Sequence, residues 1–157
     1  MVYTQSPPLT GEEAESLLRE AQVARFCSLN ADGTIHAAPV WFRYENGLIR
    51  IGTPEASRKA RNAERNRNVT VLVDVEGPPS RGLIVYGQAE LEHNVTVPMA
   101  TSVLEKYMPK EKAERLARGL LEMTRWVRIS VKPERIVSFD YAKDDTYRAA
   151  YRASQAG

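Results

Sequence analysis

Short apolar runs joined by tight turns are the feature that most limits what this chain can fold into. Asn46-Gly47 is a strong signal for a two-residue hairpin, because both residue types tolerate the positive φ that such a turn requires. Asn30–Gly33 and Gly77–Pro79 mark two further turns. Strands joined this closely run antiparallel, since a parallel pair needs a long crossover. The pattern therefore predicts an antiparallel barrel with added helices rather than a parallel α/β fold.

Six or seven strands are expected, and three of them carry distinctive residues. Val69–Val73 is a dense β-branched run that is typical of a central strand. Pro39 favours an edge or a bulge for its strand, because proline has no N–H for the ladder. Gly87 would permit the bend that barrel closure requires. The expected strands cover residues 23–29, 34–44, 48–52, 69–73, 83–91, 126–131 and 136–139, and the last two flank Lys132-Pro133.

Helical spacing of apolar residues predicts helices around and between these strands. Thr10 and Glu13 are spaced as a capping box at the start of the first helix. The others are expected over about residues 57–66, 97–107 and 109–121. The polar tail from Tyr141 fits either a helical turn or a disordered end. Because no repeat or linker interrupts the chain, we expect one domain over residues 1–157, with its core at about 22–141.

Composition excludes several classes of partner. The formal net charge of +2 is too small to indicate a polyanion partner. No window approaches the roughly 18 apolar residues of a membrane span, and residues 1–10 lack the apolar stretch of a signal peptide. The single cysteine, Cys27, rules out an intrachain disulfide framework and fits a reducing compartment. We therefore expect a cytoplasmic protein with no membrane or nucleic-acid partner.

Few residues suggest metal or side-chain chemistry. His36 and His93 lack Cys or carboxylate neighbours at ligand spacing, which argues against a metal site. Cys27 lies in an apolar strand and is expected to be a core residue rather than a nucleophile. Asp144-Asp145 is interpreted as a solvated tail. No metal site and no catalytic side chain are therefore predicted.

A plausible phosphate site lies where the third expected strand meets a helix. Ser57 can cap that helix, which places Arg58 and Lys59 in its first turn. Cations are unfavourable there unless an anion sits among them, because a helix N-terminus carries partial positive charge. Free N–H groups, the hydroxyls of Thr53 and Ser57 and the two cations could together hold a phosphate. The alternatives are a solvated basic helix start and a nucleic-acid contact, which the balanced charge disfavours.

Eight segments follow one another in an order and spacing that match a known family. They are Ala38–Phe42, Gly47 with the strand after it, Gly52-Thr53, Ser57–Ala60, Asn68–Leu72, Gly87–Leu91, Trp126–Val131 and Ile136–Phe139. Together they resemble the pyridoxamine 5′-phosphate oxidase-like split-barrel family over about residues 25–141, and the last two resemble its closing hairpin. The resemblance implies a mainly β, α+β fold: a six-stranded antiparallel Greek-key split barrel with peripheral helices. It also implies a homodimer with two flavins in grooves between subunits.

The resemblance further implies which residues hold the flavin. Arg58 and Lys59 would bind its phosphate, assisted by Ser57 and Thr53. The other implied positions line the ring: the backbone of Val40, Trp41 and Phe42, then Ile51 and Gly52 from the next strand, and Trp126 and Arg128 from the other subunit. Glycine is useful there because the backbone can approach a flat ring closely. Each of the three aromatic residues could equally be a core or dimer-interface residue.

One departure from the family narrows the expected activity. Pyridoxamine phosphate oxidases carry a C-terminal Arg-x-His-type motif, whereas Tyr141–Asp145 contains no histidine. The chain is more similar to the flavin/deazaflavin oxidoreductase branch, whose members use FMN or a phosphate-bearing deazaflavin coenzyme. We therefore predict an FMN-dependent oxidoreductase with a small planar substrate. Hydride transfer through the flavin requires no side-chain acid or base. A deazaflavin-dependent reductase and a non-catalytic flavin-binding module are the alternatives.

Overall fold

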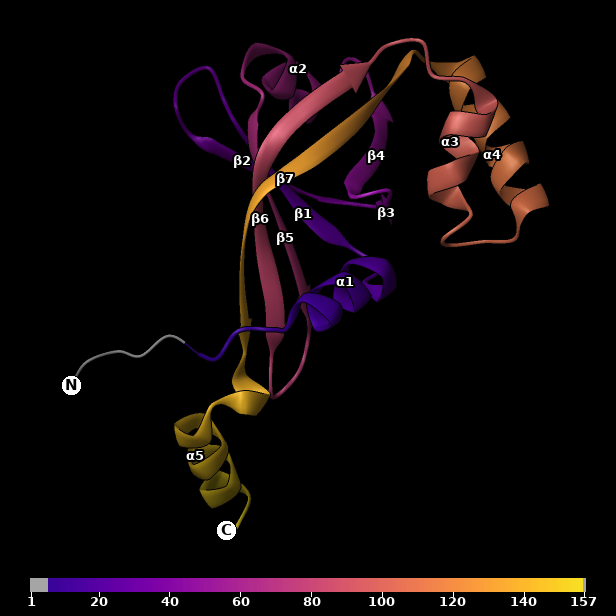
Figure 1. Cartoon of the computed structure of the whole chain (residues 1–157). Helices are drawn as coiled ribbons and strands as arrows, with labels where there is room; N and C mark the ends of the chain where they lie inside the picture. Colours follow the sequence, from indigo (N-terminus) through magenta and orange to yellow (C-terminus); the bar gives the residue numbers. More distant parts are fainter. Residues whose placement is uncertain (1–5, 157) are drawn as a thin grey trace.

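A computed structural model of the chain describes residues 6–156 and contains one curled antiparallel sheet with five α-helices (Figure 1). The seven strands follow the order β2-β1-β5-β6-β7-β4-β3. They are β1 Ala24–Leu29, β2 Ile35–Val40, β3 Arg43–Glu45, β4 Leu48–Pro54, β5 Asn68–Val75, β6 Arg81–Glu92 and β7 Trp126–Asp140. The predicted mainly β split barrel is thus confirmed. No helix in residues 6–156 is long and apolar enough to cross a membrane; the predicted lack of a signal peptide falls partly on residues 1–5, outside this range.

The second predicted strand is divided into two, and the last two predicted strands form one, so the sheet has seven strands rather than the six of the predicted barrel. β2 ends at Val40, and β3 begins at Arg43 as a short partner of β4. The break falls at Trp41-Phe42 and not at Pro39, which lies within β2 opposite Arg25. Because β2 is an edge strand, the missing N–H of Pro39 can face outward, as predicted.

The closing hairpin predicted around Lys132-Pro133 is wrong. β7 is one continuous strand that pairs with β6 along its length, from Glu92↔Arg128 to Arg81↔Asp140. Pro133 is accommodated because the register shifts between Tyr86 and Gly87, which forms a bulge. A Cβ on Gly87 would lie 2.2 Å from the carbonyl oxygen of Lys132. The bend predicted at Gly87 is therefore confirmed, and only glycine permits this approach.

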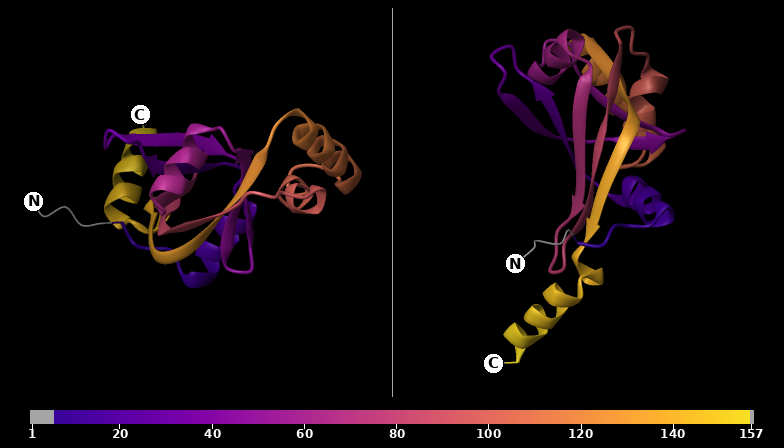
Figure 2. Two further views of the ribbon diagram at one scale, coloured as in Figure 1. Left: turned by 90° about the horizontal axis from the view of Figure 1, so that it is seen from above. Right: turned by 60° about the vertical axis from the view of Figure 1, so that its left-hand side comes forward.

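The core lies inside the curled sheet and is closed by two helices. α1 (Gly11–Glu20) starts with the predicted capping box, and α2 (Arg58–Arg65) is capped by Ser57. Figure 2 shows α2 near one end of the barrel and α1 toward the other. The largest fully buried side chains include Phe26, Phe42, Leu18, Ile49, Ile51, Leu83 and Ile129. β5 lies between β1 and β6, which confirms its predicted central position.

Two helical parts lie outside this core. α3 (Val97–Leu104) and α4 (Lys110–Met123) form a hairpin beside the barrel, with a small apolar cluster of their own (Figure 1). α5 (Asp145–Gln155) extends from the end of β7 and has no buried residue. The tail left open between helix and disorder is therefore helical.

Candidate functional site

The start of α2 brings together most of the predicted phosphate ligands. Ser57 is the N-cap, and its Oγ accepts the N–H of Ala60 at 3.4 Å. Thr53 Oγ1 donates to Ser57 Oγ at 3.1 Å, and Lys59 Nζ donates to Thr53 Oγ1 at 3.2 Å. Two hydroxyls and one ammonium thus converge beside the free N–H groups of the helix. We call this set, Thr53, Ser57 and Lys59, the anchor.

The anchor carries a positive charge that forms no ion pair with a carboxylate in the described part of the chain, residues 6–156. Lys59 is half-buried, and burial lowers the pKa of its ammonium group; no carboxylate in residues 6–156 contributes to that shift. The first turn of α2 contains no acidic residue either. Both the helix dipole and the buried ammonium are therefore better satisfied when an anion is present. Arg58 differs, because its side chain is exposed on the side of α2 that also carries Arg61 and Arg65.

The two faces of β4 divide the predicted site. Ile51 and Thr53 point into the barrel and are buried, whereas Gly52 between them faces outward. The β3–β4 ladder ends at Arg43↔Arg50, so in residues 6–156 the later part of β4 has only β7 as a strand partner. Its other edge presents backbone donors and acceptors, which the polar rim of a flat ring can bond.

The Trp41-Phe42 break is held by a residue that the sequence did not indicate. The N–H of Phe42 donates to Tyr107 Oη at 2.8 Å, and the same hydroxyl lies 3.0 Å from the Phe42 carbonyl oxygen. The Phe42 ring is fully buried, so this side chain is a core residue. Trp41 is 47% exposed and stacks on Tyr107 with ring centroids 4.5 Å apart. The backbone N–H and carbonyl of Phe42 are therefore already hydrogen-bonded to Tyr107, whereas the Trp41 indole is exposed enough to contact a ligand.

Four of the predicted residues line one apolar cavity of about 310 Å³ on the outer face of β4. They are Trp41, Gly52, Trp126 and Arg128. The register of β4 and β7 explains the last three, since it pairs Gly52 with Arg128 and Pro54 with Trp126. A Cβ on Gly52 would lie 3.6 Å from the Trp126 ring, so the indole rests on the glycine. Residues predicted to act across a dimer thus already lie together within one chain.

The α3–α4 hairpin forms the other wall of this cavity. The lining residues on this side are Val95, from the segment before α3, and Met99, Ala100, Val103, Leu104, Leu116, Leu120 and Leu121. None of them was predicted as a site residue. The available signal was that α3 contains no charged residue although it is a short surface helix. Spacing within that helix could not show which distant strands it would face.

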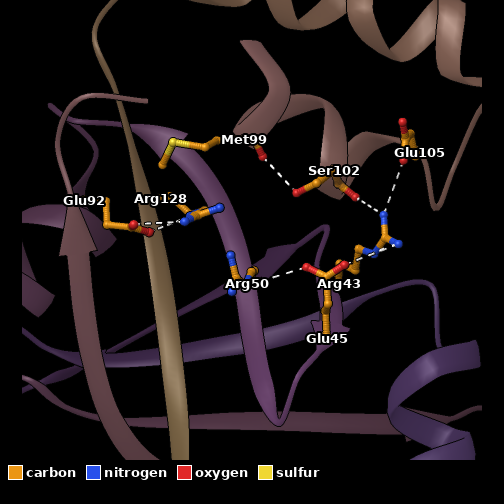
Figure 3. A network of polar contacts seen from close by, with 8 residues as sticks. All are labelled: Arg43, Glu45, Arg50, Glu92, Met99, Ser102, Glu105 and Arg128. Carbon is orange, nitrogen blue, oxygen red and sulfur yellow. Dashed lines mark hydrogen bonds and ion pairs between the residues drawn. The ribbon is translucent and has the colours of Figure 1, made fainter. Parts of the chain in front are cut away.

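Each arginine near the cavity lies within ion-pair distance of a carboxylate (Figure 3), although the buried Nε of Arg50 has no hydrogen-bond partner in residues 6–156. Arg128 makes a bidentate ion pair with Glu92, at 2.5 Å through Nε and 2.9 Å through a terminal nitrogen. Arg128, and more weakly Arg50, hold the pKa of the Glu92 carboxyl below its ordinary value. Arg50 in turn lies 3.9 Å from a carboxylate oxygen of Glu45. The outer face of β4 and β7 is therefore charged but balanced.

Two further residues lie differently from their sequence interpretation. Cys27 is partly exposed on the outer face of β1, which corrects its predicted core position; burial nevertheless raises the pKa of its thiol. His93 contacts Glu55 at 2.8 Å and Glu64 at 3.2 Å through its two ring nitrogens, and these carboxylates raise its pKa. Within residues 6–156 no group of three or more His, Cys, Asp or Glu is arranged to hold a metal ion.

Comparisons with known proteins add a family match and a shared fold. The family model "Pyridoxamine 5′-phosphate oxidase" matches residues 10–136, whereas no curated protein matches the chain. A conserved hypothetical protein from Mycobacterium tuberculosis is similar in structure, with a TM-score of 0.75 and 21% identity over 88% of this chain and 90% of that one.

Two other solved structures that are similar to the chain have names that state a function. One is named F420 reductase (TM-score 0.64, 24% identity, 82% of this chain and 98% of that one). The other is HutZ, a heme storage protein from Vibrio cholerae (TM-score 0.65, 14% identity, 83% and 94%). At these identities the likeness shows a common fold.

Proposed function

Because the chain belongs to the pyridoxamine 5′-phosphate oxidase family, we propose that it is a flavin-dependent oxidoreductase that binds FMN. The observation that carries the proposal is the anchor: a half-buried ammonium and two hydroxyls at a helix N-terminus, with no acidic residue in its first turn. This donor set fits a phosphate dianion. The bound flavin would supply hydride transfer at its N5 atom.

The chain's own residues would then bind and orient the cofactor. Thr53, Ser57 and Lys59 would hold the phosphate, and the exposed Arg58 would add long-range attraction. The open edge of β4 at Ile51–Thr53, with Val40 and Trp41 at the strand break, would bond the rim of the ring. Trp126 and Arg128 lie on the neighbouring strand β7, beside Gly52, and would border the face of the flavin ring.

No side chain with a clear acid or base role joins these residues. The one ionisable group that lines the apolar cavity, Arg128, is paired with Glu92. Hydride transfer is compatible with such a site, because it needs position and exclusion of water more than proton transfer. The same observation also suits a second candidate, a flavin-binding module without turnover. A phosphate-bearing deazaflavin coenzyme would use the same anchor and is the alternative cofactor.

We also propose that two chains pair through the outer face of β1 and β2. Ile35 is 70% exposed and lies opposite Leu29, which is 40% exposed, and Ala37 lies opposite Cys27. Apolar pairs on an open edge strand are typical of a surface that a second subunit covers. The change Ile35→Asp should yield a monomer in sedimentation, whereas a wild-type protein that is monomeric at micromolar concentration would contradict the pairing.

Two measurements on the purified protein test the function. A flavin absorption spectrum, with mass spectrometry of the released ligand, would identify FMN or deazaflavin. Bleaching of that spectrum by a reduced nicotinamide donor would support an oxidoreductase, and a bound flavin that no donor reduces would favour the module. A protein that binds neither FMN nor the deazaflavin coenzyme when they are added would contradict both.

A further inference from the structure

We propose that the cavity between the α3–α4 hairpin and the outer face of β4 and β7 binds an uncharged aromatic compound that carries a carbonyl group. The cavity measures about 310 Å³, which is within the range of small-molecule sites. The role of this compound as a substrate rests on the proposed function. Its binding rests only on the residues that line the cavity.

The walls favour a flat apolar ring. Two indoles, Trp41 and Trp126, stand on the barrel side, and leucine, valine and methionine side chains stand on the helical side. Indoles stack on aromatic rings, and the flexible thioether of Met99 can adapt to an irregular ligand. An empty apolar cavity leaves its lining atoms without dispersion partners on one side, and a ring compound would restore those contacts.

The charge balance selects an uncharged ligand. Arg128 is the one charged residue in the lining, and Glu92 neutralises it through two hydrogen bonds. Figure 3 shows Arg50 on the same side of the sheet; its Nε lies 3.9 Å from a Glu45 oxygen and has no hydrogen-bond partner in residues 6–156, but Arg50 does not line the cavity. Among the residues that line the cavity, a charged ligand would lose its hydration and find no unpaired opposite charge, which is strongly unfavourable.

A missing hydrogen bond points to the carbonyl group. The indole Nε1 of Trp126 is buried and has no acceptor in residues 6–156. Buried polar groups are nearly always hydrogen-bonded, and an unpaired donor costs free energy. Because Trp126 lines the cavity, a ligand carbonyl bound beside this indole would provide the acceptor.

The hairpin is attached in a way that leaves this cavity open. The contacts that hold it to the barrel lie near its loop: Tyr107 bonds the backbone of Phe42 and stacks on Trp41, Arg43 donates to the Ser102 carbonyl at 2.6 Å, and Lys106 donates to the Ala21 carbonyl at 2.5 Å. The apolar cluster of the hairpin is separate from the barrel core. The space between them is therefore bridged at one side and not filled by side chains.

The chain has two tryptophans, and both line this cavity, so intrinsic fluorescence reports on it directly. A bromine atom quenches indole emission on contact. We would titrate the full chain with para-bromoacetophenone, para-bromobenzoate and para-bromobenzylammonium. The ketone should bind at least about tenfold more tightly than either ion. Equal binding of the three, tighter binding of an ion, or no binding of the ketone would overturn the proposal.

Three variants test separately the effects of charge balance, the indole donor and the cavity volume on binding. Glu92→Gln frees Arg128 and should strengthen benzoate binding by about tenfold while leaving the ketone unchanged. Trp126→Phe removes the indole donor and should weaken the ketone several-fold, as read from Trp41. Ala100→Leu fills the cavity and should weaken the ketone at least about tenfold. Ala149→Leu, the same change on the exposed α5, is the control and should leave ketone binding unchanged.

Circular dichroism would check that each variant is folded, and Leu116→Phe offers a second way to fill the cavity from α4. Unchanged ketone binding in both filled, folded variants would place the ligand elsewhere. The titrations are run with and without added FMN. Ketone binding in a chain that binds no flavin would contradict the proposed function alone. Flavin binding without ketone binding would contradict this inference alone.

Discussion

The two faces of β4 carry two different kinds of site. On the inner side Thr53 belongs to the anchor, which has few residues, lies within one short segment and is positively charged. On the outer side Gly52 belongs to the apolar cavity, which combines strands with a distant helical hairpin and is electrically balanced. A ligand held at both would be fixed by charge at one end and selected by shape at the other. Affinity and specificity would then depend on different residues.

The two regions should also differ in stability. The barrel side belongs to one large buried cluster, whereas the hairpin has a small cluster of its own. Local unfolding concentrates where buried apolar contacts are few. We therefore expect the anchor to be rigid and the helical wall of the cavity to open more readily than the rest of the fold.

The largest expected effect separates these clusters. Phe26→Ala removes a fully buried ring from the barrel and should lower the free energy of unfolding by about 3–5 kcal/mol. Leu104→Ala, in the hairpin cluster, should leave the global melting temperature nearly unchanged and speed hydrogen exchange in α3 and α4. Calorimetry and exchange mass spectrometry measure the two. A large global destabilisation by Leu104→Ala would show that the hairpin and the barrel unfold as one unit.

The next effect separates buried from exposed charge at the anchor. Lys59→Ala should weaken FMN by roughly tenfold to a hundredfold, because a charge-assisted contact is worth about 1.5–3 kcal/mol. The matched Arg58→Ala should weaken it less, because the charge of an exposed side chain is screened by solvent. Riboflavin, which lacks the phosphate, serves as the control ligand in the same calorimetric titrations. Equal losses for FMN and riboflavin would mean that these residues support the fold instead.

A smaller effect concerns the connection between the two regions. Tyr107→Phe removes the hydroxyl that accepts the Phe42 N–H, and this should cost about 1 kcal/mol of unfolding free energy. The Trp41 stack would remain, so tryptophan emission should shift little. Exchange at the Phe42 amide, measured by NMR, should rise. Unchanged exchange there would indicate that water replaces the hydroxyl without loss.

The smallest effect depends on pH. His93 joins the end of β6 to Glu55 before α2 and to Glu64 within it, and these carboxylates raise its pKa. Its stabilising charge is fully present below the ordinary histidine pKa and is lost as pH rises through the raised value. The wild-type advantage over His93→Gln in melting temperature should therefore shrink with rising pH. The pairs are exposed, so the change is small; His36→Gln is the control, and a pH-independent difference would contradict the assignment.

Features set by neighbouring residues were predictable from the sequence, whereas features set by distant ones were not. The Thr10–Glu13 capping box and the cap at Ser57 depend on three or four consecutive residues, and both were found as predicted. Gly87 indicated a bend, because glycine within a strand is found mainly at bulges, bends and close backbone contacts. The predicted phosphate ligands converge because Thr53, Ser57 and Lys59 lie within one strand-to-helix turn.

The errors have a common cause. Lys132-Pro133 resembled a turn, but a bulge opposite Gly87 accommodates the proline, and that partner lies far away in sequence. Cys27 was assigned to the core because its strand is apolar, yet it lies on the outer face of that strand, between Arg25 and Leu29. The role of Tyr107 follows from contacts with Trp41 and Phe42 that no local pattern encodes.

The position of β7 also determines when this protein can finish folding. β7 is the last strand in the chain, yet it lies between β6 and β4 and connects β3 and β4 to the rest of the sheet. During synthesis the β3–β4 hairpin must therefore wait, unpaired at one edge, until residues up to about 131 have left the ribosome. The apolar cavity forms at that same moment, because Trp126 and Arg128 are among the last residues to reach it. A ligand in this cavity could therefore stabilise the fold only after the whole barrel has been synthesised.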